Sequence, residues 1–581
     1  MKYVDVILPL PLPGMFTYSV PEGMEGCVVF GKRVLVPLGK SKKYIAMVVK
    51  VHQEKPSFKV KPIEQVLDTT PTLLDLQYRL WSWISNYYMS PLGDVYNAAM
   101  PAGMKSAEKF KPRMELYVEL TSKYRNEASL HVALNMLQRA LKQSKALTTF
   151  LSLSHWDSLE NDTPREGIKK VTKEELMNEA HCTSAIVKSL IDRDILFTYE
   201  EEVGRLNTSG ESHFEQIKPL SIAQQEAYNK ILLQMMKKNV VLLHGVTSSG
   251  KTEVYIHLIK QALDNHKQVL YLLPEIALTV QIMERLHKVF GDRLGIYHSK
   301  YSDAERVEIW QKQMSGHPYD VILGARSAVF LPFQNLGLVI IDEEHETSFK
   351  QQDPAPRYHA RSAAIVLAGM YPDCKVLLGT ATPSMESYYN AQEGKYGLVE
   401  LKTRYKDIQL PEILVVDVKD LRHRKMMTGA YSPQLLAAIR EALSHGEQAI
   451  LFQNRRGFAP MVECKVCGWV PKCKNCDVSL TLHKNINLLT CHYCGYTYPV
   501  PVECPNCGST ELLGRGLGTE RIEDQLADIF PDARIARMDL DTTRTRNAYE
   551  RLIDDFSTGK TNLLIGTQMI SKGLDFDKVS V

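Results

Sequence analysis

The 581-residue sequence lacks any apolar run long enough to cross a membrane. Its first apolar stretch, "MKYVDVILPLPLPGMF", is interrupted by Asp5 and three prolines, and no small-residue cleavage pattern follows it. These absences argue against a membrane anchor and a secretory signal. We therefore expect a cytoplasmic protein with no membrane partner.

A large net charge is also missing, because 70 lysines and arginines face 67 acids and the net charge is +3. So small a net charge gives the protein no overall electrostatic attraction for nucleic acids, and any basic surface must be local. The sequence has neither an internal repeat nor a low-complexity tract. Its length and ordinary composition predict about four globular domains.

Cysteine is scarce outside one short segment, which holds eight of the eleven cysteines in four Cys-x-x-Cys pairs. A reducing cytoplasm makes such pairs metal ligands rather than disulfides. Zn²⁺ takes four thiolates, so eight predict two closed structural sites; an iron–sulfur cluster is the less favoured alternative because the compact ferredoxin spacing is absent. Spacing alone leaves open which pairs share a metal. The eight are Cys464, Cys467, Cys473, Cys476, Cys491, Cys494, Cys504 and Cys507.

The remaining cysteines, Cys27, Cys182 and Cys374, are isolated in the sequence. We expect each of them to be a small buried hydrophobe.

Hydrophobic patterning divides the chain into regions of different character. Short β-branched runs bounded by Gly and Pro predict a β-rich domain over residues 1–107. A capping box at Thr172–Glu175, a second helix and a following strand predict a winged helix over residues 108–205. The polar stretch at 203–219 is typical of a linker. After it, apolar strand segments alternate with helical segments, which predicts an α/β fold with parallel sheets.

A phosphate-binding loop is the strongest chemical signal. Gly245-x-x-x-x-Gly250-Lys251-Thr252 follows a buried-strand run and opens a helix, which is the context this motif requires. Backbone N–H groups of such a loop cradle phosphates. Lys251 is expected to reach the β- and γ-phosphates of ATP, and Thr252 to hold Mg²⁺.

An acidic cluster ends a second buried-strand run, "LGLVIIDEEHETSF". Carboxylates at the tip of a buried strand are costly to desolvate, and Mg²⁺ compensates for that cost. Asp342 is expected to hold the metal and Glu343 to orient the attacking water. Alone, this pattern could be an acidic helix N-terminus, but the upstream phosphate loop favours the catalytic interpretation.

The order Asp342-Glu343-Glu344-His345 after a phosphate loop resembles the superfamily 2 helicases. Further segments are similar to motifs of that family, in its order, and imply adenine recognition by Gln224, a DNA contact by Arg326 and a role for His345 in catalysis. They are "LSIAQQEA" (220–227), "LLPEIALTVQ" (272–281), "GARSAVF" (324–330), "GTATP" (379–383), "NRRGFAP" (454–460), "GLGTERIE" (516–523) and "GTQMISKGLDF" (566–576).

Within that superfamily the whole chain resembles the PriA family of replication-restart helicases. The aromatic-rich segment "FKQQDPAPRYHARSAA" and the N-terminal "PLPGMFTYSVPEG" carry this resemblance. It implies two RecA-like lobes with a zinc-binding insertion in lobe 2. The implied ranges are lobe 1 at 206–405, lobe 2 at 406–462 and 510–581, and the Cys-rich insertion at 463–509.

The same resemblance implies an ATP-dependent 3′→5′ DNA helicase that recognises stalled forks and starts primosome assembly in the bacterial cytoplasm, near the nucleoid. The implied partners are forked and single-stranded DNA, the 3′ end of a nascent strand, single-stranded-DNA-binding protein, primosome proteins, and the replicative helicase with its loader. Alternatives are an RNA helicase or duplex translocase, and a fork-binding scaffold whose ATPase is not essential. The family's zinc pairing is nested: 464, 467, 504 and 507 bind one ion, and 473, 476, 491 and 494 the other.

The N-terminal region carries the expected DNA contacts. Residues 31–61 contain nine Lys or Arg and one acid, which could form a basic face along a phosphate backbone or an ordinary solvated surface. The resemblance implies a pocket for a 3′ end that uses Phe16, Tyr18 and Lys61. This chain departs from the family at Thr17, where an acid is common.

The sequence stops at Val581, shortly after the 566–576 motif, and it lacks the paired-arginine motif that superfamily 2 motors use. Loss of an arginine finger typically lowers turnover by about 10³–10⁵-fold. The expectation is that residues 1–581 bind nucleotide and DNA but turn over slowly.

Overall fold

The computed structural model describes all residues except 1, 107–113, 126, 157–168, 203–215, 275–279, 299–300, 405–410, 453–460, 477, 484–487, 492–493, 516–518, 540–541, 544–545, 568–569 and 571–575. The expected linker at 203–219 and the "NRRGFAP" motif lie almost entirely outside the described residues. The 272–281, 516–523 and 566–576 motifs are described only in part. Among the described residues, no helix is long and apolar enough to span a membrane.

The first domain is an antiparallel sheet with the strand order β2-β1-β4-β3-β5. Side chains that alternate along the strands explain why this segment forms a sheet. Val4, Val6, Val34 and Val36 face one buried core, while the residues between them face the other side. Two helices follow the sheet. The elements are β1 Lys2–Ile7, β2 Phe16–Val20, β3 Arg33–Leu38, β4 Lys42–His52, β5 Gln65–Val66, α1 Asp75–Tyr87 and α2 Leu92–Ala99.

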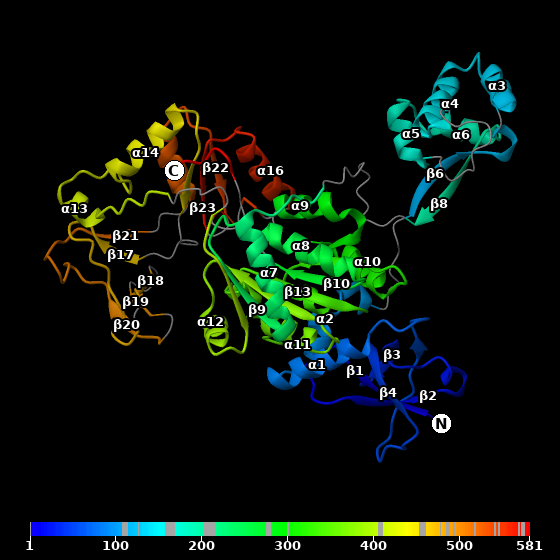
Figure 1. Cartoon of the computed structure of the whole chain (residues 1–581), viewed down its shortest axis with the longest axis horizontal. Coiled ribbons are helices and arrows are strands. Elements are labelled where there is room, and N and C mark those ends of the chain that lie inside the picture. Colours follow the sequence, from blue (N-terminus) through cyan, green and yellow to red (C-terminus); the bar gives the residue numbers. More distant parts are fainter. Residues whose placement is uncertain are drawn as a thin grey trace.

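Helices α1 and α2 lie against the third domain (Figure 1) and share one hydrophobic core with it. Trp81 of α1 and Trp310 are both fully buried in this core. Several hydrogen bonds cross the boundary; among them, Gln77 Nε2 donates to the Phe330 carbonyl at 2.8 Å, and Trp310 Nε1 donates to the Thr72 carbonyl at 2.9 Å. The N-terminal domain is therefore packed against the third domain through α1 and α2.

The second domain is a small helical unit with a three-stranded sheet of order β7-β6-β8 and its own core. The Thr172 side chain accepts a hydrogen bond from the Glu175 N–H at 3.0 Å, as the capping signal predicts. Figure 1 shows this unit set apart from the rest of the chain. Its elements are β6 Met114–Leu120, α3 Glu127–Met136, α4 Leu141–Leu153, β7 Val171–Thr172, α5 Lys173–Glu179, α6 Ser184–Asp192 and β8 Leu196–Glu202.

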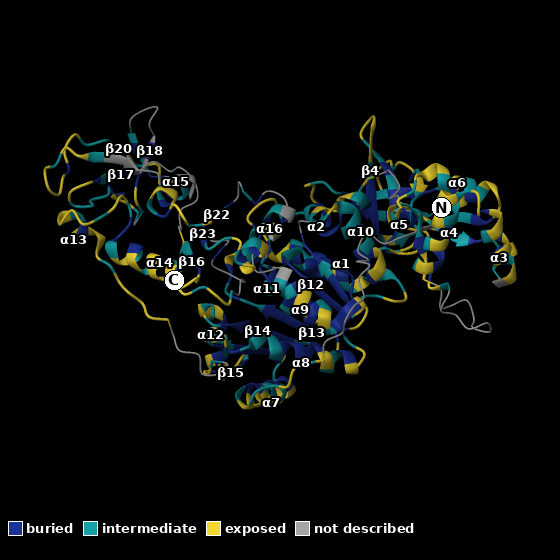
Figure 2. Ribbon diagram, turned by 90° about the horizontal axis from the view of Figure 1, so that it is seen from above, coloured by how far each residue is buried: buried dark blue, intermediate teal, exposed yellow. Residues whose placement is uncertain are grey.

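The third domain is a parallel seven-stranded sheet of order β11-β12-β10-β13-β14-β9-β15. Its central strands are buried on both faces, as Figure 2 shows, which is why their sequences are continuous apolar runs. The elements are α7 Ile222–Lys237, β9 Val240–Gly245, α8 Lys251–Asp264, β10 Gln268–Leu272, α9 Val280–Phe290, β11 Leu294–Tyr297, α10 Asp303–Met314, β12 Val321–Gly324, the 3₁₀ turn η8 Arg326–Phe330, β13 Leu336–Asp342, α11 Ala360–Ala368, β14 Lys375–Thr380, α12 Met385–Gln392 and β15 Gly397–Leu401.

The last part holds a parallel three-stranded sheet of order β16-β23-β22 and, between β16 and β22, a Cys-rich module of short antiparallel strands. This α/β architecture with a Cys-rich insertion agrees with the fold expected from the sequence. The elements are α13 Val418–His423, α14 Pro433–Ser444, β16 Ala449–Phe452, β17 Met461–Cys464, β18 Thr481–His483, β19 Leu488–Thr490, β20 Thr497–Pro499, β21 Leu512–Arg515, α15 Thr519–Ile529, β22 Ile535–Met538, α16 Arg546–Ser557 and β23 Leu563–Gly566.

The expectation for the isolated cysteines is only partly right. Cys374 is buried, and burial raises the pKa of its thiol to about 12. Cys182 is half-buried, and Cys27 is exposed, so the prediction for Cys27 is wrong. Cys27 follows the short 3₁₀ turn at Glu22–Met24, and the residues from 21 to 27 are all exposed or half-buried.

Candidate nucleotide site and zinc centres

The phosphate loop joins the end of β9 to the start of α8. Gly250 has a φ of 76° and immediately precedes Lys251, the first residue of the helix. This backbone angle favours glycine, and a Cβ at Gly250 would lie 2.2 Å from the Gln224 amide nitrogen, so a larger residue would also displace the Gln224 side chain from the loop. The Lys251 ammonium donates to the Gly245 carbonyl at 3.1 Å. It therefore lies folded over the loop where phosphates would bind.

Gln224 braces this loop from α7. Its Oε1 accepts from the Ser221 N–H at 2.9 Å, and its Nε2 donates to the Ser249 carbonyl at 3.1 Å. The side chain is almost fully buried. The structure thus shows Gln224 as a link between the helix cap and the phosphate loop, and its contact with adenine stays a prediction.

The acidic cluster begins where β13 ends, two strands from β9 in the sheet. Asp342 accepts hydrogen bonds from the Tyr255 hydroxyl at 3.0 Å and the Tyr271 hydroxyl at 3.5 Å. Burial, followed by the charge of Glu343, raises the pKa of Asp342 to about 6, while Lys251 acts in the opposite direction. Lys251 and Asp342 therefore lie within electrostatic reach of each other across the strand ends.

The two tyrosines are functional neighbours that sequence reasoning missed. Tyr255 lies one turn after Thr252 on α8, and Tyr271 lies within the buried strand β10. In the sequence, the only indication of such a role is that each is a tyrosine, which carries a hydroxyl group, among mostly apolar residues. We assign them to holding the Asp342 carboxylate in place.

Glu343 and His345 extend the cluster toward β14. Glu343 adopts a φ of 48°, which a non-glycine residue rarely does, and its N–H donates to Asp342 Oδ1 at 3.0 Å. His345 Nδ1 lies 2.8 Å from Thr380 Oγ1 and 3.6 Å from Glu343 Oε2. Because β13 and β14 are parallel neighbours with Asp342 opposite Gly379, the acidic turn meets the 379–383 segment directly.

The raised pKa of Asp342 predicts a pH dependence of Mg²⁺ binding. Metal binding requires the ionised carboxylate, so the apparent Mg²⁺ affinity should fall by about tenfold per pH unit below about pH 6. Without metal, the lobe should lose stability as the pH rises from about 4 to about 6, because in this range the unfolded chain has already lost the Asp342 proton while the folded chain still holds it; above about pH 6 both states are ionised and no further change is expected. Titration of Mg²⁺ into the protein–nucleotide complex at pH values between 5 and 8 measures the apparent Mg²⁺ affinity. Free ATP titrated in parallel corrects for protonation of the nucleotide, and a flat affinity between pH 5 and 7 would contradict the prediction.

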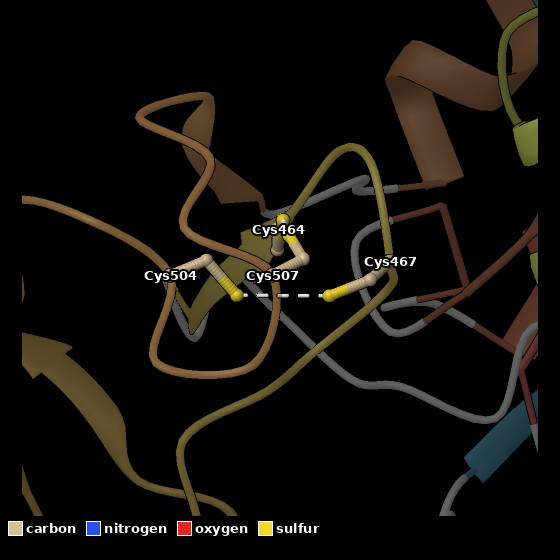
Figure 3. A group of neighbouring side chains, drawn as sticks. All are labelled: Cys464, Cys467, Cys504 and Cys507. Atoms are coloured by element: carbon tan, nitrogen blue, oxygen red, sulfur yellow. Dashed lines mark hydrogen bonds between the residues drawn. The ribbon is translucent and has the colours of Figure 1, made fainter.

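The eight clustered cysteines form two groups of four. Within each group all the sulfur atoms lie within 4.8 Å of one another. Cys464, Cys467, Cys504 and Cys507 form one group (Figure 3), and Cys473, Cys476, Cys491 and Cys494 form the other. This is the nested arrangement that the family resemblance implies.

The sulfur geometry fits zinc. The Sγ–Sγ distances are 3.5 Å for Cys464–Cys507, 3.6 Å for Cys467–Cys504 and 3.5 Å for Cys473–Cys494. Four ligands at about 2.3 Å in a tetrahedron place sulfurs about 3.8 Å apart. The protein accordingly carries two structural Zn²⁺ ions.

Three of the four Cys-x-x-Cys turns share one backbone geometry. Gly468, Gly495 and Gly508 follow the second cysteine with φ values of 68°, 75° and 71°. Each glycine N–H donates to the carbonyl of the first cysteine of its pair, at 2.8–2.9 Å. A positive φ at this point is why glycine recurs there.

The N-terminal residues expected to contact DNA lie on or beside the edge strand β2. The Tyr18 hydroxyl donates to the Pro37 carbonyl at 3.1 Å, and the exposed Lys61 side chain donates to the Gly39 carbonyl. Phe16 packs half-buried on the same core as Tyr18. Thr17 lies on the opposite face of the strand, where its hydroxyl donates to Asp5 Oδ1 at 2.7 Å. The sequence alone gave no hint of this contact.

Arg326 lies in η8, beside the aromatic-rich segment. Its Nη1 donates to the carbonyls of Ser348 at 3.3 Å and Lys350 at 3.2 Å. The structure thus joins Arg326 to the segment that follows the acidic cluster, and its contact with DNA stays a prediction.

Four family profiles match the chain in order. They are described as a 3′DNA-binding domain of PriA (residues 5–101), a winged helix domain of PriA helicase from Bacteroidota (115–203), a DEAD/DEAH box helicase (221–391) and the Cys-rich region domain of PriA DNA helicase (473–499). Together they fall on the first three domains and on the inner part of the Cys-rich module.

Curated relatives match the chain along its whole length. The replication restart protein PriA of Bacillus subtilis is 35% identical over 100% of this chain and 78% of its own length. The protein of the same name from Haemophilus influenzae is 36% identical over 100% of this chain and 76% of its own. Among solved structures, the Mycobacterium smegmatis helicase Lhr bound to single-stranded DNA and AMP-PNP is 17% identical with a TM-score of 0.37, over 61% of this chain and 40% of its own. That last likeness is too distant to carry an argument.

Proposed function

The chain belongs to the PriA family of replication restart proteins, and we propose how its parts divide the work of that family. It is an ATP-dependent DNA helicase that recognises stalled replication forks and restarts replication. We assign it 3′→5′ movement on single-stranded DNA and the start of primosome assembly.

The ATPase assignment rests on one observation: three motifs lie together at the carboxyl ends of three neighbouring strands, β9, β14 and β13. The phosphate loop follows β9, the acidic turn starts at the last residue of β13, and the 379–383 segment starts at the end of β14, which lies between β9 and β13 in the sheet. Lys251 neutralises phosphate charge, while Thr252 and Asp342 would hold Mg²⁺, which stabilises charge that develops on the phosphates. Glu343 orients water, and His345 relays the state of this turn to Thr380.

The N-terminal sheet supplies recognition of the 3′ end. Phe16, Tyr18 and Lys61 are assigned to the pocket for the terminal nucleotide, in which the buried Tyr18 supports Phe16 from within the core. Thr17, which replaces the acid that is common in the family, lies on the other face of β2, so the 3′-hydroxyl is assigned to reach it around the edge of this strand. Because the Thr17 hydroxyl donates to Asp5, its oxygen lone pairs remain able to accept a hydrogen bond from a 3′-hydroxyl, and Asp5 supplies the negative charge behind it. A 3′-phosphate would meet this charge unfavourably.

This assignment predicts that Thr17→Val weakens binding of an oligonucleotide with a 3′-hydroxyl by about tenfold, the cost of one hydrogen bond at a charged group. Binding of the same oligonucleotide with a 3′-phosphate should change little. Fluorescence anisotropy measures both. Thr121→Val is the matched control, because the Thr121 hydroxyl donates to the Asp194 carbonyl in the winged helix. Equal losses for both DNA ends, or a Thr121→Val loss of the same size, would contradict the assignment.

The family function itself is tested by unwinding of forked DNA with and without a leading strand that ends in a 3′-hydroxyl. We expect faster unwinding when the end lies at the branch. Stronger stimulation of ATP hydrolysis by single-stranded RNA than by the fork would instead favour the RNA-helicase alternative.

The partners proposed for this chain are single-stranded-DNA-binding protein, primosome proteins, and the replicative helicase with its loader. Family membership supports this proposal, and so does the position of the zinc module, which lies beside lobe 2 (Figure 1). We assign the module a contact role at the fork or with a primosome protein, and we place the protein at the chromosome in the cytoplasm.

A further inference from the structure

The third acid of the Asp-Glu-Glu-His turn has no role in the scheme above. Glu344 is fully buried, with a relative exposure of 0%. Burying an ionised carboxylate is unfavourable unless it is paired and hydrogen-bonded, so its surroundings should show what it does.

Glu344 is surrounded by donors from two helices. Its Oε1 accepts from the Ser384 N–H at 2.7 Å, and its Oε2 accepts from the Ser384 and Ser387 hydroxyls at 3.0 and 2.8 Å. Arg361, the second residue of α11, donates through Nη1 to the same Oε2 and to Ser384 Oγ. The carboxylate therefore joins the acidic turn to the start of α11 and to the start of α12.

These two helix starts lie next to the segments that handle nucleotide and DNA. Ser384 caps α12 and directly follows the 379–383 segment, whose Thr380 contacts His345. The start of α11 is the end of the aromatic-rich segment, where Lys350 and His359 form a backbone bridge. The Glu344 N–H also donates to the Gly379 carbonyl at 3.2 Å. One residue thus ties all three segments together.

Stability alone is a weak reason for such an arrangement. Replacing a buried ion pair by apolar side chains of similar size is often neutral or stabilising, so a well-packed apolar residue would serve the core equally well. What an apolar residue would not do is hold the turn in one geometry. Glu343, the residue immediately before Glu344, has the rare φ of 48°, and such a conformation persists only where its surroundings hold it.

We propose that Glu344 is a positioning residue for ATP hydrolysis. Through Arg361, Ser384 and Ser387 it holds Glu343 and His345 in the orientation needed for water attack and for contact with Thr380. It touches neither nucleotide nor metal. The proposal rests on the ATP site assigned above and adds to it a residue that acts through Glu343 and His345.

The test is Glu344→Gln, which keeps the size of the side chain and removes its charge. The partners behind catalytic or metal-binding groups typically contribute about 10–100-fold to activity. We therefore expect DNA-stimulated kcat to fall at least tenfold, while KM and the Kd of a fluorescent ATP analogue stay within twofold. In a double-mutant cycle with Arg361→Gln, the double variant should be no slower than the worse single variant, because both changes break one unit.

Two further variants keep the test decisive if Glu344→Gln folds poorly. Ser387→Ala removes one hydroxyl donor and leaves the Ser384 cap of α12 intact, and we expect a kcat loss of two- to fivefold with unchanged KM. Asp320→Asn, which removes an exposed acid paired with Arg293 in the same lobe, is the control and should leave kcat unchanged.

The proposal is overturned if Glu344→Gln and Ser387→Ala both retain kcat within twofold, or if their losses appear in KM and nucleotide affinity instead. It is also overturned if the double variant shows the product of the two single effects. A Lys251→Ala variant assayed in parallel separates the possibilities: if that variant is inactive while Glu344→Gln is normal, the ATP site stands and only the positioning role fails.

Discussion

Replacing Lys251 with alanine is expected to lower ATP turnover by at least about 10²–10³-fold, the usual cost of removing one preorganised charge from a developing anion. The structure gives the reason, because the Lys251 ammonium lies over the phosphate loop at 3.1 Å from the Gly245 carbonyl. Steady-state ATP hydrolysis with saturating forked DNA measures the loss. Zinc content and DNA binding should not change, since neither depends on this side chain.

Lys260→Ala is the matched control for that prediction. Lys260 lies on the same helix and pairs with Asp264 at the surface, so its loss should leave turnover intact. The same Lys251→Ala variant also separates a motor from a scaffold. If fork restart and loading of the replicative helicase continued undiminished without ATP hydrolysis, the scaffold function would be the main one.

Removal of zinc ligands is expected to have the second large effect. Structural zinc contributes about 10–16 kcal/mol in small zinc-finger peptides, and the Cys-rich module has only a small cluster of apolar side chains of its own. Cys473→Ser should therefore lower the zinc content from two ions per chain to one and unfold the inner half of the module. Metal analysis and protease sensitivity between residues 463 and 509 measure these changes.

Pairs of substitutions test which cysteines share an ion. Cys473→Ser with Cys491→Ser disrupts one group and should leave one zinc per chain, whereas Cys464→Ser with Cys473→Ser disrupts both and should leave none. Cys27→Ser is the control, because this exposed thiol belongs to neither group. Equal zinc loss in the two double variants would show that the nested pairing is wrong.

The chemistry of the motor could be recognised from the sequence because it depends on local patterns. A phosphate loop needs glycines and a lysine at fixed spacing between a strand and a helix, and Gly250 and Lys251 satisfy that need wherever the segment lies in the fold. The zinc ligands are local in the same sense, since each Cys-x-x-Cys turn forms within five residues. The residue types, the metals and the nucleotide could therefore be predicted before any coordinates.

Tertiary structure decided how distant segments meet. Eight cysteines permit several pairings, and only the folded module brings Cys464 together with Cys507. Tyr255 and Tyr271 meet Asp342, Arg361 meets Glu344, and Asp5 meets Thr17 only after helices and strands pack. A local pattern determines which chemical groups are available and their immediate backbone geometry. Packing of elements far apart in the chain determines their neighbours, and those neighbours set the pKa, the orientation and the partner of each functional group.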